Sequence, residues 1–327
     1  MTQLHRYWIE ELEARGARSG QRHGVACVLA DGPRGIVDLS NQGVIAFRGP
    51  DAREFLQGYL TCDTDDIAAD RPVPGALCNL QGRVITNFVA VQRDAAICLR
   101  MHRSVIEPTF DALRKYIVFS KTKMEDASDR WVRIGIHEPE AEQALGEALT
   151  TPDAGFAFEL PDASNRHELW IEPDGRALVD RLLERFGLMS PSQWDRLAID
   201  AMSPEITQAT SARFLPQMLR LDELGAVSFE KGCYLGQEIV ARVQYRGEHK
   251  RELTALQADA LEKEPSLGTK VCANGKPAGE VVMVAKTNEK DPIALLAVLP
   301  RGTDPENDTL TLEGIADSSL QNLLKTT

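Results

Sequence analysis

One cysteine of this sequence lies in a setting that could make its thiol reactive. Cys233 directly follows Gly232, and Gly236 comes three residues later, so the backbone can turn sharply here or let a ligand approach closely. Lys231 precedes the cysteine by two residues, and Arg242 follows on a segment that we expect to be a helix starting after Gly236. A nearby cation and the positive end of a helix both favour the thiolate, the nucleophilic form of cysteine. The alternative is a small apolar side chain buried in a linker.

The predicted helix and one tryptophan each allow two interpretations. Arg242 and Arg246 are four residues apart and would share one helix face, which is either solvated or an anion clamp. Gln237 and Glu238 would lie in the first turn, where an acidic residue is favoured. Trp194 could pack in the core or stack on a flat aromatic ligand. The spacing alone leaves these alternatives open.

The other five cysteines show no comparable setting. They are Cys27, Cys62, Cys78, Cys98 and Cys272. The sequence contains no C-x-x-C pair and no Cys/His cluster with the spacing of zinc ligands. It therefore predicts no metal site and no disulfide framework, which is typical of a protein in the reducing cytoplasm.

Alternating strand and helix patterns must position these residues. Leu4, Trp8 and Leu12 share one helical face, which predicts an N-terminal helix ending near Gly16. Between residues 25 and 202, short apolar runs and amphipathic segments follow the order strand–helix–strand–strand–helix–strand twice. This order indicates an α+β fold of two related, ferredoxin-like halves rather than a doubly wound sheet. Neither familiar type of glycine-rich phosphate loop is present.

The pattern changes near residue 250. Short runs such as TKVCANG and PIALLAVLP are broken by Gly, Pro and Asn, which predicts a small antiparallel β-barrel or sandwich, of which we favour the barrel. We therefore divide the chain into a larger domain, 1–246, and a C-terminal barrel, 247–327. The halves of the larger domain are expected at about 1–125 and 126–246.

The charge of the chain limits its partners. Its 327 residues include 37 Lys and Arg against 49 Asp and Glu, a net charge of −12. This balance argues against wholesale electrostatic binding of nucleic acid or of an anionic membrane. No apolar run approaches the roughly 18 residues of a membrane span. Residues 227–251 run against the acidic trend with five basic and three acidic groups, so the charge distribution points to the segment that contains Cys233.

The same segment resembles the signature of a known family. KGCYLGQE at 231–238, with Arg242 four residues on, looks like the motif of the YgfZ proteins. That family belongs to the folate-binding superfamily of the glycine cleavage T-protein. RGPD at 48–51 with FLQG at 55–58 is similar to the family's N-terminal segment, and KY at 115–116 with FSK at 119–121 to its middle. The resemblance thus extends over much of the chain.

The resemblance implies a channel for tetrahydrofolate or another folate, and a role in assembling or repairing iron–sulfur clusters for enzymes such as the tRNA methylthiotransferase. It implies that Cys233 is the functional thiol, that Lys231 is the partner of its charge, and that Trp194 lines the folate site. The remaining signature residues are expected to contact the cofactor: Gly232, Tyr234, Gln237, Glu238 and Arg242. The expected partners are folate and iron–sulfur proteins or cluster-assembly factors. We expect neither membrane binding nor direct tRNA binding.

Three residues depart from the superfamily pattern in ways that bear on function. Thr86 and Asn87 stand where the T-protein has a pair of aspartates, and Gln42 stands where some relatives carry a second tryptophan for folate. Aminomethyl transfer needs a carboxylate to manage protons at the reacting nitrogen, so the missing pair argues against an aminomethyltransferase. Whether the protein is an enzyme stays open. The alternatives are a folate-dependent one-carbon transferase or demethylase, and an interaction module for a tRNA-modifying enzyme or tRNA.

Overall fold

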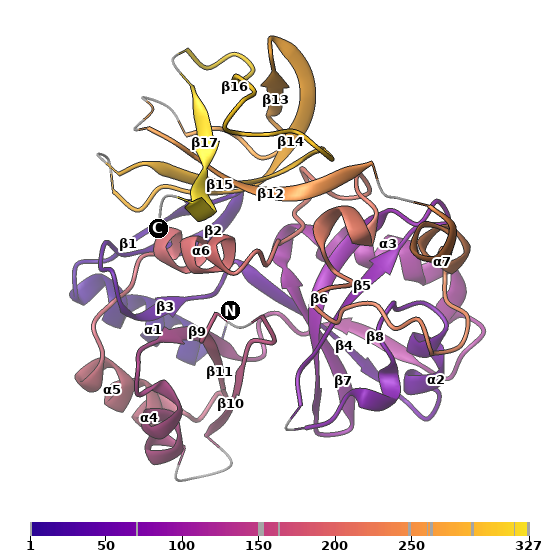
Figure 1. Cartoon of the computed structure of the whole chain (residues 1–327). Coiled ribbons are helices and arrows are strands. Elements are labelled where there is room, and N and C mark those ends of the chain that lie inside the picture. Colours follow the sequence, from indigo (N-terminus) through magenta and orange to yellow (C-terminus); the bar gives the residue numbers. More distant parts are fainter. Residues whose placement is uncertain are drawn as a thin grey trace.

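The chain folds into two open β-sheets and a closed β-barrel (Figure 1). The computed structural model describes residues 2–69, 71–149, 154–162, 164–247, 250–259, 261, 264–288, 291–316 and 318–325. Helix α6 (Pro191–Asp200) lies beneath the barrel and above the smaller sheet in Figure 1, and it contacts barrel strands β14 and β15. The mixed helix-and-sheet architecture with a C-terminal barrel is the α+β fold class that the sequence predicts.

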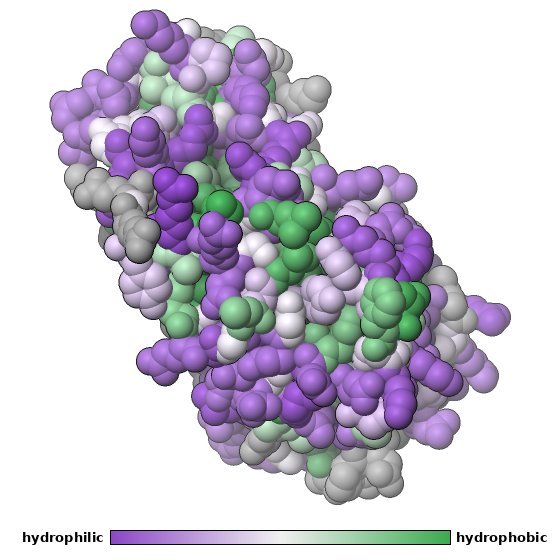
Figure 2. Space-filling model, turned by 90° about the vertical axis from the view of Figure 1, so that its right-hand side faces the viewer, coloured by the Kyte–Doolittle hydropathy of each residue, from purple (hydrophilic) through white to green (hydrophobic). Residues whose placement is uncertain are grey.

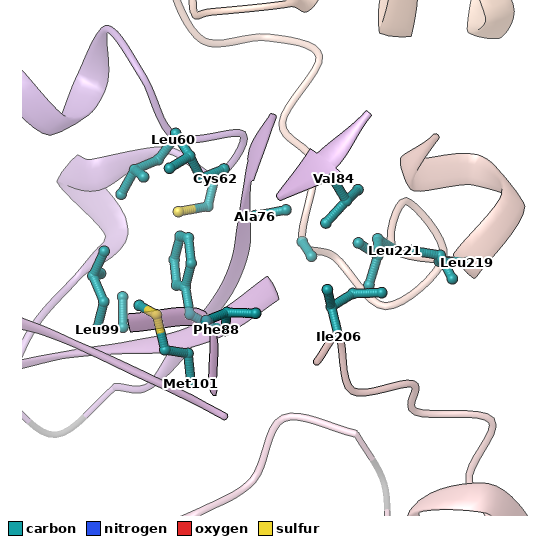
Figure 3. Close-up of a cluster of buried hydrophobic side chains, with 14 of the residues drawn as sticks. Leu60, Cys62, Ala76, Val84, Phe88, Leu99, Met101, Ile206, Leu219 and Leu221 are labelled. Atoms are coloured by element: carbon teal, nitrogen blue, oxygen red, sulfur yellow. The ribbon is translucent and has the colours of Figure 1, made fainter. Parts of the chain in front are cut away.

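The larger open sheet has five antiparallel strands in the order β5-β6-β7-β4-β8. They are β4 (Gln42–Arg48), β5 (Val73–Cys78), β6 (Val84–Arg93), β7 (Ala96–His102) and β8 (Lys123–Asp126), with helices α2 (Ala52–Gln57) and α3 (Ile106–Ile117). Figure 3 shows the core of this sheet, where Leu60, Cys62 and Phe88 face one another. Leu219 and Leu221 join this core from a segment far along the chain (Figure 3).

The smaller open sheet has four antiparallel strands in the order β10-β11-β9-β3. They are β3 (Gly35–Asp38), β9 (Val132–His137), β10 (Gly155–Glu159) and β11 (His167–Ile171), with helices α1 (Gln3–Ala14), α4 (Ala141–Ala148) and α5 (Arg176–Arg185). The predicted N-terminal helix is confirmed, because α1 buries Leu4, Trp8 and Leu12. The chain leaves it through Gly16, whose φ of +90° favours glycine.

The two sheets do not divide the chain at residue 125, as the expected halves require. Strand β3 pairs with β9, with Ile36 opposite Ile136, so an N-terminal strand belongs to the second sheet. In the other direction, the amide of Val84 in β6 donates to the carbonyl of Phe214 at 2.8 Å. The chain therefore crosses from the smaller sheet to the larger after β3, returns after β8, and reaches the larger sheet again at Phe214. Periodicity locates each strand, but the partner of a strand depends on contacts between distant residues.

The predicted C-terminal barrel is confirmed, with the closed strand order β12-β15-β14-β13-β16-β17. Its strands are β12 (Arg251–Ala258), β13 (Lys270–Ala273), β14 (Lys276–Ala285), β15 (Ile293–Pro300), β16 (Leu310–Leu312) and β17 (Leu320–Asn322). A separate hairpin joins β1 (Arg18–Arg22) to β2 (Val25–Leu29), and helix α7 spans Gln237–Arg246. Short 3-10 turns occupy Thr64–Asp66, Arg103–Val105, Pro216–Leu219 and Leu323–Lys325. No helix in the described part of the chain is long and apolar enough to cross a bilayer.

Candidate functional site

A cleft of about 720 Å³, including its mouth, lies where the larger sheet, α6 and the barrel meet. Most of this volume is open to solvent at the mouth, and the enclosed space is about 70 Å³. Its apolar lining includes Phe88 of β6, Met283 of barrel strand β14 and Leu221. Its polar lining includes Gln42, Asn87, Arg100, Asp162, Arg166, Asp195 and Glu205. Apolar walls with a few converging polar groups are the usual lining of a site for a flat organic ligand.

Trp194 lines this cleft, as the resemblance implies, but its ring is also packed as a core side chain. The residue is only 4% exposed. The guanidinium of Arg166 lies over the ring, 4.7 Å from its centroid. Gly135 leaves room for the indole because it has no side chain. A Cβ at this position would lie 2.9 Å from two atoms of the ring. Trp194 is therefore a packed wall of the cleft that Arg166 and the smaller sheet hold in place, and its stacking on a ligand stays a prediction.

Two buried polar side chains in the cleft wall have atoms without a hydrogen-bond partner among the described residues. These atoms are Oε1 of Gln42 and Nε of Arg100. Arg100 is otherwise paired, with Glu168 and, at 3.5 Å, with Glu205. An unsatisfied buried polar atom costs about 1–3 kcal/mol, so a ligand that supplies the missing partner gains affinity. A pterin edge carries both donors and acceptors, and glutamate carboxylates pair with guanidinium groups, so these residues fit a folate.

Asn87 holds one edge of the cleft with both ends of its side-chain amide. Its Nδ2 donates to the carbonyl of Pro204 at 2.7 Å, and its Oδ1 accepts from the amide of Ile206 at 2.8 Å. An ionised aspartate could not make the first of these bonds, because it has no donor. The amide therefore fixes the 204–206 segment at the edge of the cleft. The carboxylates that do line the cleft are each paired with an arginine: Asp162 with Arg166, Asp195 with Arg22, and Glu205 with Arg100.

Residues 228–236, which we call the signature loop, expose the thiol of Cys233 to solvent. The predicted helix after Gly236 is confirmed as α7, which begins at Gln237. Four other cysteines are buried, and burial raises the pKa of Cys27 to about 11 and the pKa values of Cys62, Cys78 and Cys98 to about 12. Those thiols stay protonated at neutral pH, and Cys272 is half-buried in the barrel. Cys233 is thus the solvent-exposed thiol of the chain, and the buried-linker alternative is wrong.

Lys231 is held by the protein interior. Its Nζ donates to the carbonyls of Leu60 at 2.8 Å and Cys62 at 2.7 Å, and the side chain is buried. Burial lowers the pKa of this ammonium group, partly offset by Cys62 and by Asp63. These bonds fasten the signature loop to the chain that follows α2. The structure therefore supports a positioning role for Lys231, and its action on the charge of Cys233 stays a prediction.

The remaining signature residues shape the loop and do not line the cleft. The amide of Leu235 donates to the carbonyl of Gly58 at 3.1 Å. Gly236 has a φ of +83°, and a Cβ there would lie 2.4 Å from the carbonyl oxygen of Asn79. Tyr234 is buried, Gly232, Glu238 and Arg242 are exposed, and Gln237 is half-buried. Of the predicted cofactor-binding residues, Trp194 alone is among the residues described as lining the cleft, and the side chain of Arg246 lies outside the described part.

A continuous segment connects the cleft to the thiol. Ala226 lines the cleft, and its carbonyl accepts a hydrogen bond from Oγ1 of Thr61 at 2.6 Å. The amide of Ser228 then donates to the carbonyl of Thr61 at 2.9 Å. Lys231 binds the carbonyls on either side of Thr61, those of residues 60 and 62. Residues 60–62 therefore anchor both the cleft wall and the base of the signature loop.

Sequence reasoning missed most of the cleft lining. Its charged residues include Arg100 and Glu205, and neither belongs to a motif. The available signal was Arg100 itself, a charged residue inside the apolar strand run AICLRMH. No cluster of three or more His, Cys, Asp or Glu side chains that could hold a metal ion occurs among the described residues.

Lys231→Met is expected to destabilise the fold. The substitution leaves two buried carbonyls without a donor, which costs about 2–3 kcal/mol in the free energy of unfolding, measured by urea denaturation. Lys276→Met, at an exposed position in the barrel, is the matched control. Equal losses for the two variants would show that the hydrogen bonds of Lys231 do not hold the signature loop.

Comparisons with known proteins agree with the signature. A family model described as the GCVT N-terminal domain matches residues 31–160. The tRNA-modifying protein YgfZ of Klebsiella pneumoniae (strain 342) is 30% identical over 294 residues, which cover 85% of this chain and 88% of that protein. The chain belongs to the YgfZ family. Its YgfZ relative from Yersinia pestis (strain Pestoides F) is 32% identical over 274 residues, covering 79% of this chain and 82% of that protein.

The fold of this YgfZ-family chain is shared with a solved enzyme. The glycine cleavage system aminomethyltransferase T from Bartonella henselae superposes with a TM-score of 0.74 and covers 96% of each chain. The two sequences are 19% identical. At this identity the likeness shows a common fold and says nothing about a common reaction.

Proposed function

We propose that this YgfZ-family chain is a tetrahydrofolate-binding accessory protein that supports iron–sulfur enzymes of tRNA modification, with Cys233 as its functional thiol. The curated relatives carry the name tRNA-modifying protein, and the family model is a GCVT domain. The observation that carries the proposal is the cleft, in which buried Gln42 and Arg100 have polar atoms without partners beside apolar walls. Those features match a flat, polar-edged ligand with an anionic tail.

Each wall of the cleft has a distinct task in holding the cofactor. Phe88, Leu221 and Met283 supply the apolar surface and exclude water. Gln42 offers an acceptor, while Arg100 offers a donor and a positive charge for a carboxylate. When bound, a reduced folate supplies one-carbon and reducing chemistry.

The exposed thiol of Cys233 suits exchange with a partner protein. A single cysteine cannot hold an iron–sulfur cluster, whose irons usually need four protein ligands, so the remaining ligands must come from the partner. The thiolate can hold an iron or sulfur intermediate, exchange with a cluster thiol, or accept a one-carbon unit. All three roles need a solvent-accessible sulfur, which Cys233 provides and the four buried cysteines do not.

Gln42→Leu tests the cleft. Tetrahydrofolate is expected to quench tryptophan fluorescence in the wild type, because Trp194 lines the cleft. The substitution removes the unpartnered acceptor at similar volume, so Kd should rise about tenfold, or ~1.4 kcal/mol, while the free energy of unfolding stays equal or increases. Gln208→Leu, at an exposed position outside the cleft, is the control. Absence of saturable binding in the wild type, or equal Kd values for both variants, would contradict the folate site.

A folate-dependent one-carbon transferase or demethylase is the second candidate. The observation that favours it is Glu205, a cleft carboxylate whose contact with Arg100 is long, at 3.5 Å. Such a carboxylate could take a proton from a reacting amine. Asn87 opposes this function, because its amide occupies the place of the superfamily's acidic group. Turnover of N-methyl amines in the presence of tetrahydrofolate separates the two functions.

A further inference from the structure

Exposed apolar side chains surround the signature loop. Five large apolar residues in the described part of the chain are strongly exposed: Leu80, Val118, Phe119, Tyr245 and Leu324. The first four belong to segments that pack around the signature loop, and Phe119 is the most exposed of all, at 89%. Figure 2, which views the side of the molecule that carries α3 and α7, shows apolar side chains gathered on this face.

The turn between β5 and β6 places Leu80 beside the loop. Asn79 and Gly82, on either side of Leu80, both lie against Gly236, so closely that a Cβ on Gly236 would clash with them. Gly82 also faces α7, since a Cβ there would lie 3.0 Å from the Cβ of Ile239. Leu80, which is exposed, therefore lies next to the first turn of α7.

Two aromatic contacts connect the other exposed residues to the loop. Tyr245 of α7 packs edge-on against Phe229 of the signature loop, at 6.1 Å between ring centroids. On the other side, Tyr116 at the end of α3 packs against Tyr59 at 4.9 Å. The amide of Phe119 donates to the carbonyl of Tyr116 at 3.2 Å.

Tyr59 directly follows Gly58 in the chain. The carbonyl of Gly58 accepts a hydrogen bond from the amide of Leu235 in the signature loop, so Tyr59 connects the end of α3 to that loop. Leu80, Val118, Phe119 and Tyr245 thus lie on segments that contact the signature loop directly or through one packed residue, and we call these four residues and the thiol of Cys233 the signature face.

The charge of the signature face differs from that of the chain. Its segments 79–83, 115–123 and 229–245 carry five exposed basic residues and two exposed acidic ones, with Lys231 buried, whereas the whole chain has a net charge of −12. Contiguous exposed apolar groups mark interaction sites, and a basic surrounding selects an acidic partner. The aliphatic side chains of Leu80 and Val118 favour a protein partner over RNA, because they offer no ring on which a base can stack.

We propose that the signature face is the docking surface for an acidic protein, and that docking presents Cys233 to that protein. The apolar side chains would form the core of the interface and the cations its rim. The inference deepens the proposed function by assigning a partner surface, and rests on it for the role of Cys233. It does not depend on the cleft, because no residue of the signature face lines the cleft.

Site-specific photo-crosslinking tests the docking surface in the full-length chain. Phe119 or Tyr245 is replaced by p-benzoylphenylalanine in cells that lack their own copy of the protein, and Leu324, exposed near the C-terminus, is the control position. One acidic protein should crosslink at 119 and at 245 but not at 324. That protein, once purified, should bind the wild type with an affinity that falls as salt rises.

Binding to the purified partner gives the decisive comparison. The double variant Leu80→Ser with Phe119→Ser should raise the Kd for the partner at least tenfold, whereas Leu324→Ser should leave it unchanged. Tetrahydrofolate binding should be the same in the wild type and in both variants. Crosslinks to RNA or to a second copy of this chain would overturn the proposal. So would equal crosslinking at position 324, or the absence of a crosslink at 119 and 245. A Kd that the double substitution leaves unchanged would overturn it as well. If the wild type does not bind tetrahydrofolate, the proposed function is contradicted, and the docking result still stands.

Discussion

Cys233→Ala is expected to abolish tRNA methylthiolation in cells that depend on this protein, while the fold and tetrahydrofolate binding stay unchanged. The thiol is exposed, so its removal creates no cavity and should change the free energy of unfolding by less than about 0.5 kcal/mol. Its chemistry cannot be replaced by the four buried cysteines, whose pKa values burial raises to about 11 or 12. The readout is the methylthiolated fraction of tRNA, measured by mass spectrometry in a complementation assay.

The chain contains its own control for this experiment. Cys272 is a half-buried thiol in the barrel and belongs to neither the cleft nor the signature loop. Cys272→Ala should retain full methylthiolation. Full activity of Cys233→Ala would remove the thiol from the mechanism, and a similar loss in both variants would point to an effect on stability instead.

Arg22→Met is expected to lower the free energy of unfolding by about 3–5 kcal/mol at pH 7. Arg22 of the β1–β2 hairpin forms a buried ion pair with Asp195 of α6. It also donates to Oγ of Ser192 at 2.9 Å and to the carbonyl of Val284, in barrel strand β14, at 3.1 Å. The substitution leaves a buried carboxylate without its cation and separates the hairpin from both α6 and the barrel. Urea denaturation at pH 7 measures the loss.

The loss should depend on pH through Asp195. Burial acts to raise the pKa of this carboxyl, but Arg22 and His23 outweigh burial and lower it to about 2. A carboxyl group whose pKa is lower in the folded than in the unfolded state stabilises the fold. This stabilisation is complete above the unfolded-state pKa of about 4 and is lost as pH falls toward 2. The difference between wild type and Arg22→Met should therefore shrink as pH falls from about 4 to about 2.

Arg18→Met is the matched control for this prediction. Arg18 lies on the same strand, but its pair with Asp31 is 3.5 Å long and both side chains are exposed. An exposed pair contributes about 0–1 kcal/mol, so this variant should remain close to the wild type at every pH. Equal losses for Arg18→Met and Arg22→Met would show that the buried pair does not hold the hairpin.

Local patterns in the sequence were sufficient for several elements. The spacing of Leu4, Trp8 and Leu12 predicted α1, the glycine before Gln237 predicted the start of α7, and the repeated short runs after residue 250 predicted the barrel. The glycines and charges around Cys233 also identified the one fully exposed thiol of the six. These properties depend on neighbouring residues along the chain, so the sequence by itself determined them.

Only the tertiary structure decided how these elements meet. Lys231 lies two residues from Cys233 in sequence, yet its ammonium group binds carbonyls of residues 60 and 62. The cleft combines Gln42, Arg100 and Met283, which no motif connects. The direction of a side chain and the partner of a strand depend on burial and hydrogen bonding between residues far apart in the chain, which a local pattern does not contain.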